Sequence, residues 1–153
     1  MADNTVVTAA EGGRIVPAAR ADAAAFRVRE GEDPWTDAEL DAVQAQLVSE
    51  AEGLRQEIVA VDADLTSLLL EANEGAGEDQ ADAGSKTFER EHEMSIARNS
   101  RDLLAQVERA LDRMVDGSYG SCESCGQPIS KGRLQAFPRA VLCMTCKQRE
   151  ERR

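Results

Sequence analysis

The only cysteines of the chain lie in two pairs near its C-terminus. Cys122 and Cys125 form one Cys-x2-Cys pair, and Cys143 and Cys146 form a second after an interval of seventeen residues. Two such pairs separated by about 15–20 residues are typical of a structural zinc site. A tetrahedral Zn²⁺ needs four thiolates at about 2.3 Å, so each turn must present two sulfurs on one side. Gly126, which follows the first pair, suits the positive φ of such a turn.

Three other chemistries use paired cysteines. Disulfides fit poorly, because the N-terminal residues do not resemble a secretory signal and an exported domain would not usually cluster all its cysteines in one short segment. A rubredoxin-like iron site and redox-active dithiols remain alternatives. Four thiolates leave no open coordination position, so we expect one Zn²⁺ that holds a fold together and does not catalyse.

Composition predicts a small folded part with long exposed helices instead of one large core. Aromatic residues make up 3% of the chain and charged residues 31%; this leaves little bulky apolar material for a core. There is no run of 18 apolar residues, so we expect no membrane span and a cytoplasmic location.

The net charge of −11 is divided unevenly along the chain. From Tyr119 onward there are seven Lys/Arg and three Glu residues, which gives +4; the preceding part has eleven basic and 26 acidic residues, which gives −15. Nucleic acid should repel the acidic part. We therefore expect no direct sequence-specific DNA binding.

A long helix is predicted from residue 36. Thr36 and Glu39 form a capping box, and Trp35 can pack against Leu40 as a hydrophobic staple. Apolar residues then recur at steps of three and four over about 33 residues, which is typical of a coiled-coil seam. They are Leu40, Val43, Leu47, Ala51, Leu54, Ile58, Val61, Leu65, Leu68 and Ala72.

Three glycines within residues 74–84 predict the end of this helix and a reversal of the chain. A second helix is predicted from near Ser85 to Met114 or Val115. Its predicted seam is Phe88, His92, Ile96, Ser100, Leu103 or Leu104, Val107, Ala110 or Leu111, and Met114. The acidic first helix has a single cation, Arg55, whereas the second helix has five arginines: Arg90, Arg98, Arg101, Arg109 and Arg113.

These patterns predict an antiparallel coiled-coil hairpin over residues 36–117 in a monomeric protein. A parallel dimer through the first helix is the alternative. Residues 1–35 read as a mostly disordered tail, although a short helix near residues 18–29 could dock through Phe26 and Val28. Residues 118–153 are predicted to form the zinc finger and a short C-terminal helix. The predicted fold is mainly α: a long hairpin, a small four-cysteine zinc finger and a largely disordered N-terminal tail.

Acidic residues without a neighbouring cation collect around the predicted turn at residues 74–84. Such loops are usually solvated surface. At the end of a long hairpin, however, clustered carboxylates such as Asp79 and Asp82 could also approach a cationic or metal-bound site on a partner.

Together, the hairpin and the cysteine pairs resemble the DksA/TraR family of bacterial transcription factors, from about Leu40 to Lys147. The most specific stretch is G-S-Y-G-S-C-E-S-C-G, which ends at Gly126. It is followed by Ile129, Arg133-Leu134, Pro138 and Leu142-Cys143-x-x-Cys146-Lys147.

This resemblance implies a regulator that binds RNA polymerase by inserting its hairpin into the secondary channel, where it modulates initiation. The family's tip motif, Asp-x-x-Asp-x-Ala, corresponds here to Asp79, Asp82 and Gly84, with glycine in place of alanine. That glycine removes a methyl group and loosens the backbone.

The sequence also bears on three other classes of function. A nucleic-acid-binding zinc finger is an alternative, but the basic residues after Tyr119 are scattered and only Phe137 and Tyr119 offer aromatic rings nearby. A coiled-coil adaptor is a further alternative. We do not expect an enzyme, because His92, the only histidine, has no nucleophile beside it in the predicted seam.

Overall fold

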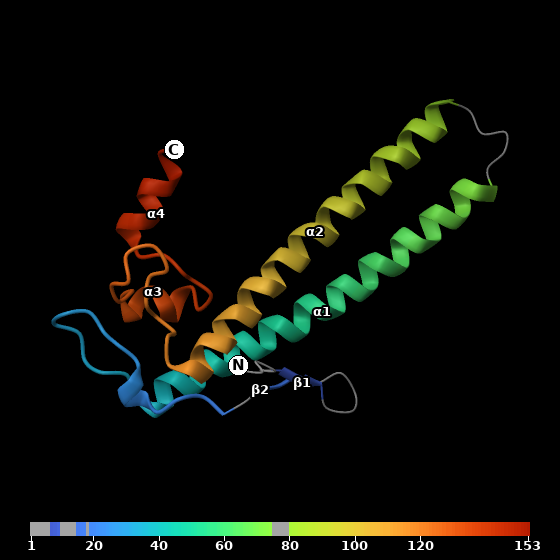
Figure 1. The fold of residues 1–153 in the computed structure, drawn as a ribbon. Helices are drawn as coiled ribbons and strands as arrows, with labels where there is room; N and C mark the ends of the chain where they lie inside the picture. The colour runs from blue at the N-terminus through green and yellow to red at the C-terminus, as the bar shows by residue number, and fades with distance from the viewer. Residues whose placement is uncertain (1–6, 10–14, 18, 75–79) are drawn as a thin grey trace, which may run out of the picture. The chain divides into compact units, whose positions relative to one another are not determined.

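The computed structural model describes residues 7–9, 15–17, 19–74 and 80–153. The fold is mainly helical, as predicted (Figure 1). Its two long helices are α1 (Asp37–Glu74) and α2 (Gln80–Asp116), and two short ones, α3 (Lys131–Ala136) and α4 (Met144–Glu151), follow. The short elements near the N-terminus are β1 (Val7–Ala9), β2 (Ile15–Pro17) and the 3-10 helix η1 (Ala23–Ala25). None of the described helices has the long apolar stretch needed to cross a membrane.

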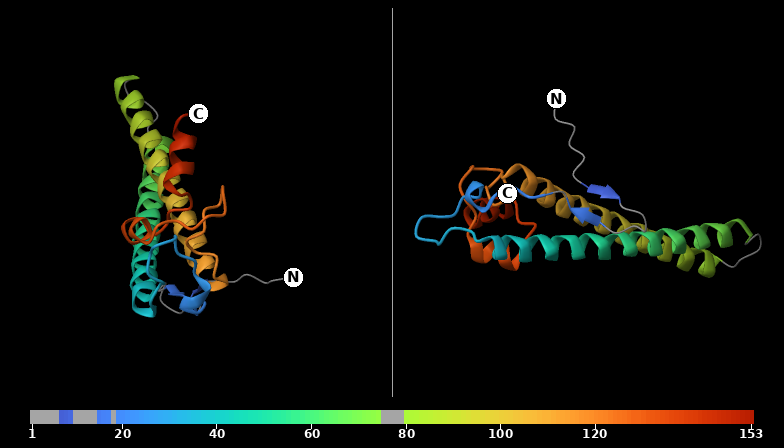
Figure 2. Two further views of the ribbon diagram at one scale, coloured as in Figure 1. Left: turned by 90° about the vertical axis from the view of Figure 1, so that its left-hand side faces the viewer. Right: turned by 90° about the horizontal axis from the view of Figure 1, so that it is seen from below.

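The chain forms two compact units, and both long helices contribute to each. The first unit contains residues 1–51 and 106–153, and the second contains residues 52–105. In each unit the segments of α1 and α2 run side by side in opposite directions (Figures 1 and 2). The antiparallel hairpin is therefore confirmed. The division of the chain into a tail (1–35), a hairpin (36–117) and a zinc finger (118–153) stays a prediction.

The start of α1 follows the predicted capping box. The backbone N–H of Thr36 donates to a carboxylate oxygen of Glu39 at 3.0 Å, and the N–H of Glu39 donates to Thr36 Oγ1 at 3.2 Å. These bonds satisfy N–H groups that have no partner within the helix. Trp35 and Leu40 are both buried, at 4% and 0% exposure, as expected for a hydrophobic staple.

The predicted seam of α1 is confirmed over most of its length. Leu40, Val43, Leu47, Ala51 and Val61 are buried. The other predicted seam residues of α1 are half-buried, except Ala72 near the end of the helix, which is exposed. The three–four spacing alone was enough to identify the face that α1 buries.

The predicted seam of α2 is correct from Ile96 onward and wrong before it. Phe88 is 73% exposed, and His92 is exposed as well. The less exposed positions instead follow a different register with steps of four and three. They are Lys86, Arg90, Glu93, Ala97 and Ser100, and the predicted seam residue Ile96 is half-buried beside them. Long charged side chains are tolerated at such positions because their aliphatic stems can cover apolar surface while the charge stays in water.

The expected charge pairing between the two long helices is seen between Arg101 and Asp62 in the second unit. Arg101 Nη2 lies 2.5 Å from Asp62 Oδ1. Arg109 and Arg113 instead pair with Glu123, which lies between the first two cysteines. The arginines near the C-terminal end of α2 therefore form ion pairs with the cysteine-bearing segment and not with the acidic face of α1.

Residues 19–35, hereafter the N-terminal segment, pack within the first unit. Phe26 is 5% exposed, and its ring meets Tyr119 edge-on with 6.5 Å between centroids. The N–H of Ala21 donates to the Met114 carbonyl at 2.9 Å, and Arg27 donates to the Gly126 carbonyl at 3.0 Å. For these residues the docked alternative holds and the disordered tail does not, although the element found is η1 and not a helix over residues 18–29.

The strands β1 and β2 were not predicted. They pair in antiparallel fashion, with Thr8 opposite Val16. Strands of three residues are too short for alternation of apolar and polar residues to reveal them. The remaining part of the predicted tail, at residues 1–6, 10–14 and 18, lies outside the described residues.

Candidate metal centre

The first cysteine pair is held by a turn that requires glycine. Gly126 has a φ of 73°, as its place after the pair predicted, and its N–H donates to the Cys122 carbonyl at 2.9 Å. The N–H of Cys122 in turn donates to the Gln127 carbonyl at 2.8 Å. A side chain at residue 126 would be strained in this left-handed conformation. The turn therefore directs Cys122 and Cys125 to the same side.

The second pair uses the beginning of α4. Cys143 is the N-cap residue and Cys146 lies in the first turn, where the N–H of Lys147 donates to the Cys143 carbonyl at 2.9 Å. The N–H of Cys143 also points at Cys122 Sγ, 3.4 Å away. This contact joins the two pairs through a backbone donor.

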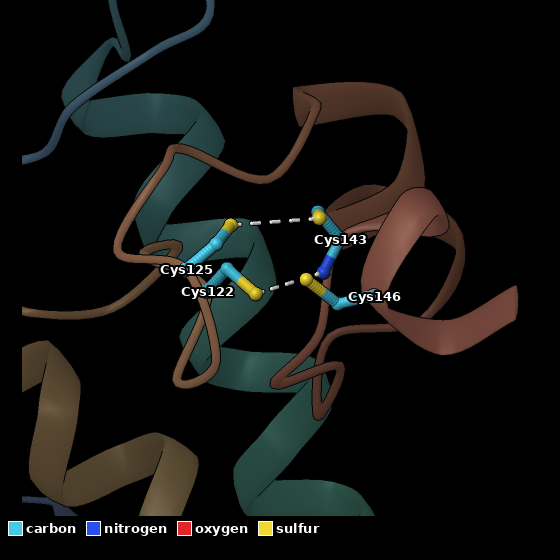
Figure 3. Close-up of side chains that lie close together, drawn as sticks. All are labelled: Cys122, Cys125, Cys143 and Cys146. Atoms are coloured by element: carbon cyan, nitrogen blue, oxygen red, sulfur yellow. Dashed lines mark hydrogen bonds between the residues drawn. The ribbon is translucent and has the colours of Figure 1, made fainter. Parts of the chain in front are cut away.

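The four sulfur atoms converge on one centre (Figure 3). All of them lie within 4.8 Å of one another, and Cys125 Sγ is 3.8 Å from Cys143 Sγ. A tetrahedron with metal–sulfur distances of about 2.3 Å has edges of about 3.8 Å. A disulfide would need about 2.05 Å. The geometry therefore fits a closed four-thiolate metal site and not a pair of disulfides.

Backbone donors favour ionisation of the more buried thiol. Burial acts to raise the pKa of Cys122, but the N–H groups of Cys143, Cys125 and Ser124 outweigh it and lower that pKa to about 6. For the exposed Cys125, the N–H of Gln127 acts to lower the pKa, yet the neighbouring thiols of Cys122, Cys146 and Cys143, together with desolvation, raise it to about 11. Four close sulfurs cannot all be charged without a compensating cation. A divalent metal supplies that charge.

A small core supports the two cysteine pairs. Tyr119, Ile129 and Leu134 are almost fully buried, and the Tyr119 hydroxyl donates to the Pro138 carbonyl at 2.7 Å. Burial raises the pKa of Tyr119, so this hydroxyl keeps its proton. Arg113 donates to the carbonyls of Ser118 and Ser121, just ahead of Cys122. Sequence reasoning missed this role of Arg113, because nothing in its spacing separates it from the other arginines of α2.

The predicted tip residues do not lie together in a described loop. Asp79 is outside the described residues. Asp82 is exposed in the first turn of α2, where a carboxylate interacts favourably with the helix dipole. Gly84 also lies inside α2, since that helix begins at Gln80 and not near Ser85. A Cβ at Gly84 would meet no atom within 4 Å.

Comparisons with known proteins agree with this geometry. A family model described as the prokaryotic dksA/traR C4-type zinc finger matches residues 117–152. Zinc is therefore the ion that the four cysteines are positioned to hold, and as a closed site it would stabilise the finger.

Relatives match well beyond the finger. The chain is 32% identical over 128 residues to the RNA polymerase-binding transcription factor DksA of Caulobacter vibrioides, covering 84% of this chain and 87% of the relative. It is 31% identical over 122 residues to the protein of the same name from Escherichia coli K12, covering 80% and 78%. The solved structure of transcription factor DksA2 from Pseudomonas aeruginosa has a TM-score of 0.63 and 28% identity, covering 76% of this chain and 85% of that one. The chain therefore belongs to the DksA/TraR family of C4-type zinc-finger proteins.

Proposed function

We propose that this protein is a cytoplasmic transcription regulator that binds RNA polymerase and modulates initiation by inserting its helical hairpin into the secondary channel. The observation that carries the proposal is an antiparallel pair of long helices in a chain whose relatives are named RNA polymerase-binding transcription factors. The zinc finger gives the protein a folded base without a catalytic metal. The protein acts as a monomer, without chemistry of its own.

Acidic groups at the turn between α1 and α2 would act on the polymerase. Asp82 is exposed at the start of α2, and Asp79 precedes it in the sequence. Exposed carboxylates gain little stability from their surroundings, so they are available to a cationic or metal-bound group of a partner. In this proposal, binding depends on the rest of the chain, and the effect on initiation depends on these carboxylates.

The experiment separates binding from regulation. The double variant Asp79→Asn, Asp82→Asn removes both charges with little change in side-chain size. We expect it to bind core RNA polymerase within about threefold of the wild type, since few contacts are lost, and to lose most of its effect on a responsive promoter. Glu57→Gln, an exposed change elsewhere on α1, is the control. A double variant that regulates as well as the wild type would show that the acidic turn has no such role.

A further inference from the structure

A cavity next to the cysteines is lined by three arginines from three different segments. Its volume is about 310 Å³, and it is contained within the first unit. Arg29 comes from the N-terminal segment, Arg133 from α3 and Arg149 from α4. Cys125, Cys143 and Cys146 line the same cavity, but no carboxylate does.

Arg133 is held in position at this cavity. Its Nε donates to the Leu142 carbonyl at 3.3 Å, and its Nη1 lies 3.0 Å from Met144 Sδ. The guanidinium also lies over the Phe137 ring, 5.9 Å from the centroid. Within the described chain these contacts leave Nη2 without a partner. A guanidinium fixed in this way loses little further freedom when it binds an anion.

The three arginines have no acidic partner among the described residues, unlike three basic residues on or beside α3 and α4. Lys131 pairs with Glu39, Arg139 with Glu50, and Lys147 with Glu150 and Glu151. Across the described residues, no carboxylate lies within ion-pair distance of the Arg29, Arg133 or Arg149 side chains. The cavity thus concentrates positive charge that the chain itself does not neutralise.

The metal centre offsets only part of this charge. One Zn²⁺ with four thiolates has a net charge of about −2, whereas the three arginines contribute +3. The remaining positive charge suits an anionic group, and the planar guanidinium matches a carboxylate through paired hydrogen bonds. Cavities of about 300 Å³ are at the lower limit of ligand sites. This one would accommodate one or two side chains and not a folded element.

We propose that this basic cavity receives acidic side chains of the polymerase and so forms a second contact, apart from the hairpin turn. The inference rests on the proposed function and adds an interaction surface to it. A protein carboxylate is favoured over nucleic acid because the chain before Tyr119 has a charge of −15. Such a charge repels a polyanion along its whole length but affects a single carboxylate much less.

The test uses the double variant Arg29→Gln, Arg149→Gln in the full chain. Neither side chain makes a hydrogen bond or ion pair with another described residue, so the fold should be retained. Arg152→Gln, Arg153→Gln is the matched control, because it removes the same charge from exposed residues that do not line the cavity. Affinity for core RNA polymerase is measured at about 0.1 M and about 0.5 M salt, where screening of exposed charges differs strongly. Zinc retention is measured for each protein during a chelator challenge.

We expect the cavity variant to bind roughly tenfold more weakly at low salt, which corresponds to the loss of one charge-assisted contact. The control should stay within about twofold, and the difference between the two should shrink at high salt. Equal affinity of the two variants would overturn the proposal. Early zinc loss from the cavity variant alone would also overturn it, because the arginines would then stabilise the metal centre. Tighter binding of the wild type to DNA than to polymerase through these arginines would overturn it as well. If the wild type itself does not bind polymerase, both the proposed function and this inference are wrong. If the wild type binds and the cavity variant binds equally well, only this inference is wrong.

Discussion

The backbone around the cysteines positions their sulfur atoms at the metal centre. The left-handed Gly126 turn, the N-cap position of Cys143 and the bond from the Cys143 N–H to Cys122 Sγ bring the two pairs together. Each of these features involves one of the four cysteines or the residue that follows one in the sequence. A single change at a ligand should therefore affect the metal and the fold of the finger together.

Cys143→Ser tests this coupling. The wild type should contain one zinc per chain after purification without a metal column, whereas Cys143→Ser should retain little, because three thiolates leave the tetrahedral site incomplete. The segment from Tyr119 to Lys147 should lose its protection from amide exchange, while most of the helical circular dichroism remains. Thr145→Ser, in the same turn, is the control. A wild type purified under reducing conditions with no zinc would contradict the assignment.

The capping residue Glu39 gives a pH-dependent prediction. Its pKa is lowered chiefly by Lys131, and also by the N–H of Thr36. The charged carboxylate therefore favours the folded state above the ordinary glutamate pKa of about 4.3, and this contribution is lost as the pH falls through the lowered folded-state pKa. Glu39→Gln should melt at a lower temperature than the wild type at neutral pH, and the difference should shrink as the pH falls through the lowered pKa of Glu39.

The control for this change is Glu57→Gln, which is exposed on α1. It should alter the melting temperature little at either pH. A difference between Glu39→Gln and the wild type that persisted unchanged in acid would show that packing, and not the charge of Glu39, is responsible.

At the scale of elements, the long helices follow from local signals that the sequence displays. The capping box at Thr36 and the three–four spacing from Leu40 to Leu68 each predicted what the structure contains. The N-terminal half of α2 was harder, since its bulkiest apolar residue, Phe88, points away from the seam. There the register follows from pairing with α1, and that information lies outside the segment itself.

Gly84 provides a prediction about the beginning of α2. It lies in the helix, its φ is not left-handed, and an added Cβ would meet nothing within 4 Å. Gly84→Ala should therefore stabilise this part of α2 by about 0.5–1 kcal/mol, measured as slower amide exchange near residue 84. If the proposed function holds, the firmer helix should also strengthen the effect on transcription.

Gly31→Ala is the opposite control. Gly31 also has open space where a methyl group would be added, but its φ of 86° disfavours a side chain. The change should therefore destabilise the protein. If Gly84→Ala destabilised the protein to the same degree, the helix would not begin at Gln80.

At the scale of the whole molecule, the contacts hardest to foresee join segments that are distant in the sequence. Glu32 accepts from the Lys131 N–H, Arg27 binds the Gly126 carbonyl, and Phe26 packs on Tyr119. The N-terminal segment has few apolar residues and no helical period, so composition suggested disorder. The cysteine spacing, in contrast, predicted that all four sulfur atoms converge, because metal geometry restricts residue type and interval together.

The central claim is that the turn between α1 and α2 reaches the interior of RNA polymerase. Site-specific photo-cross-linking from Ser85, exposed near the start of α2, tests this most directly, with Gln148 on α4 as the comparison position. Both positions should yield adducts in the complex with core polymerase. We predict that Ser85 cross-links to the wall of the secondary channel beside the active centre and that Gln148 does not. A complex in which Ser85 cross-links only to the outer surface of the polymerase would contradict the account.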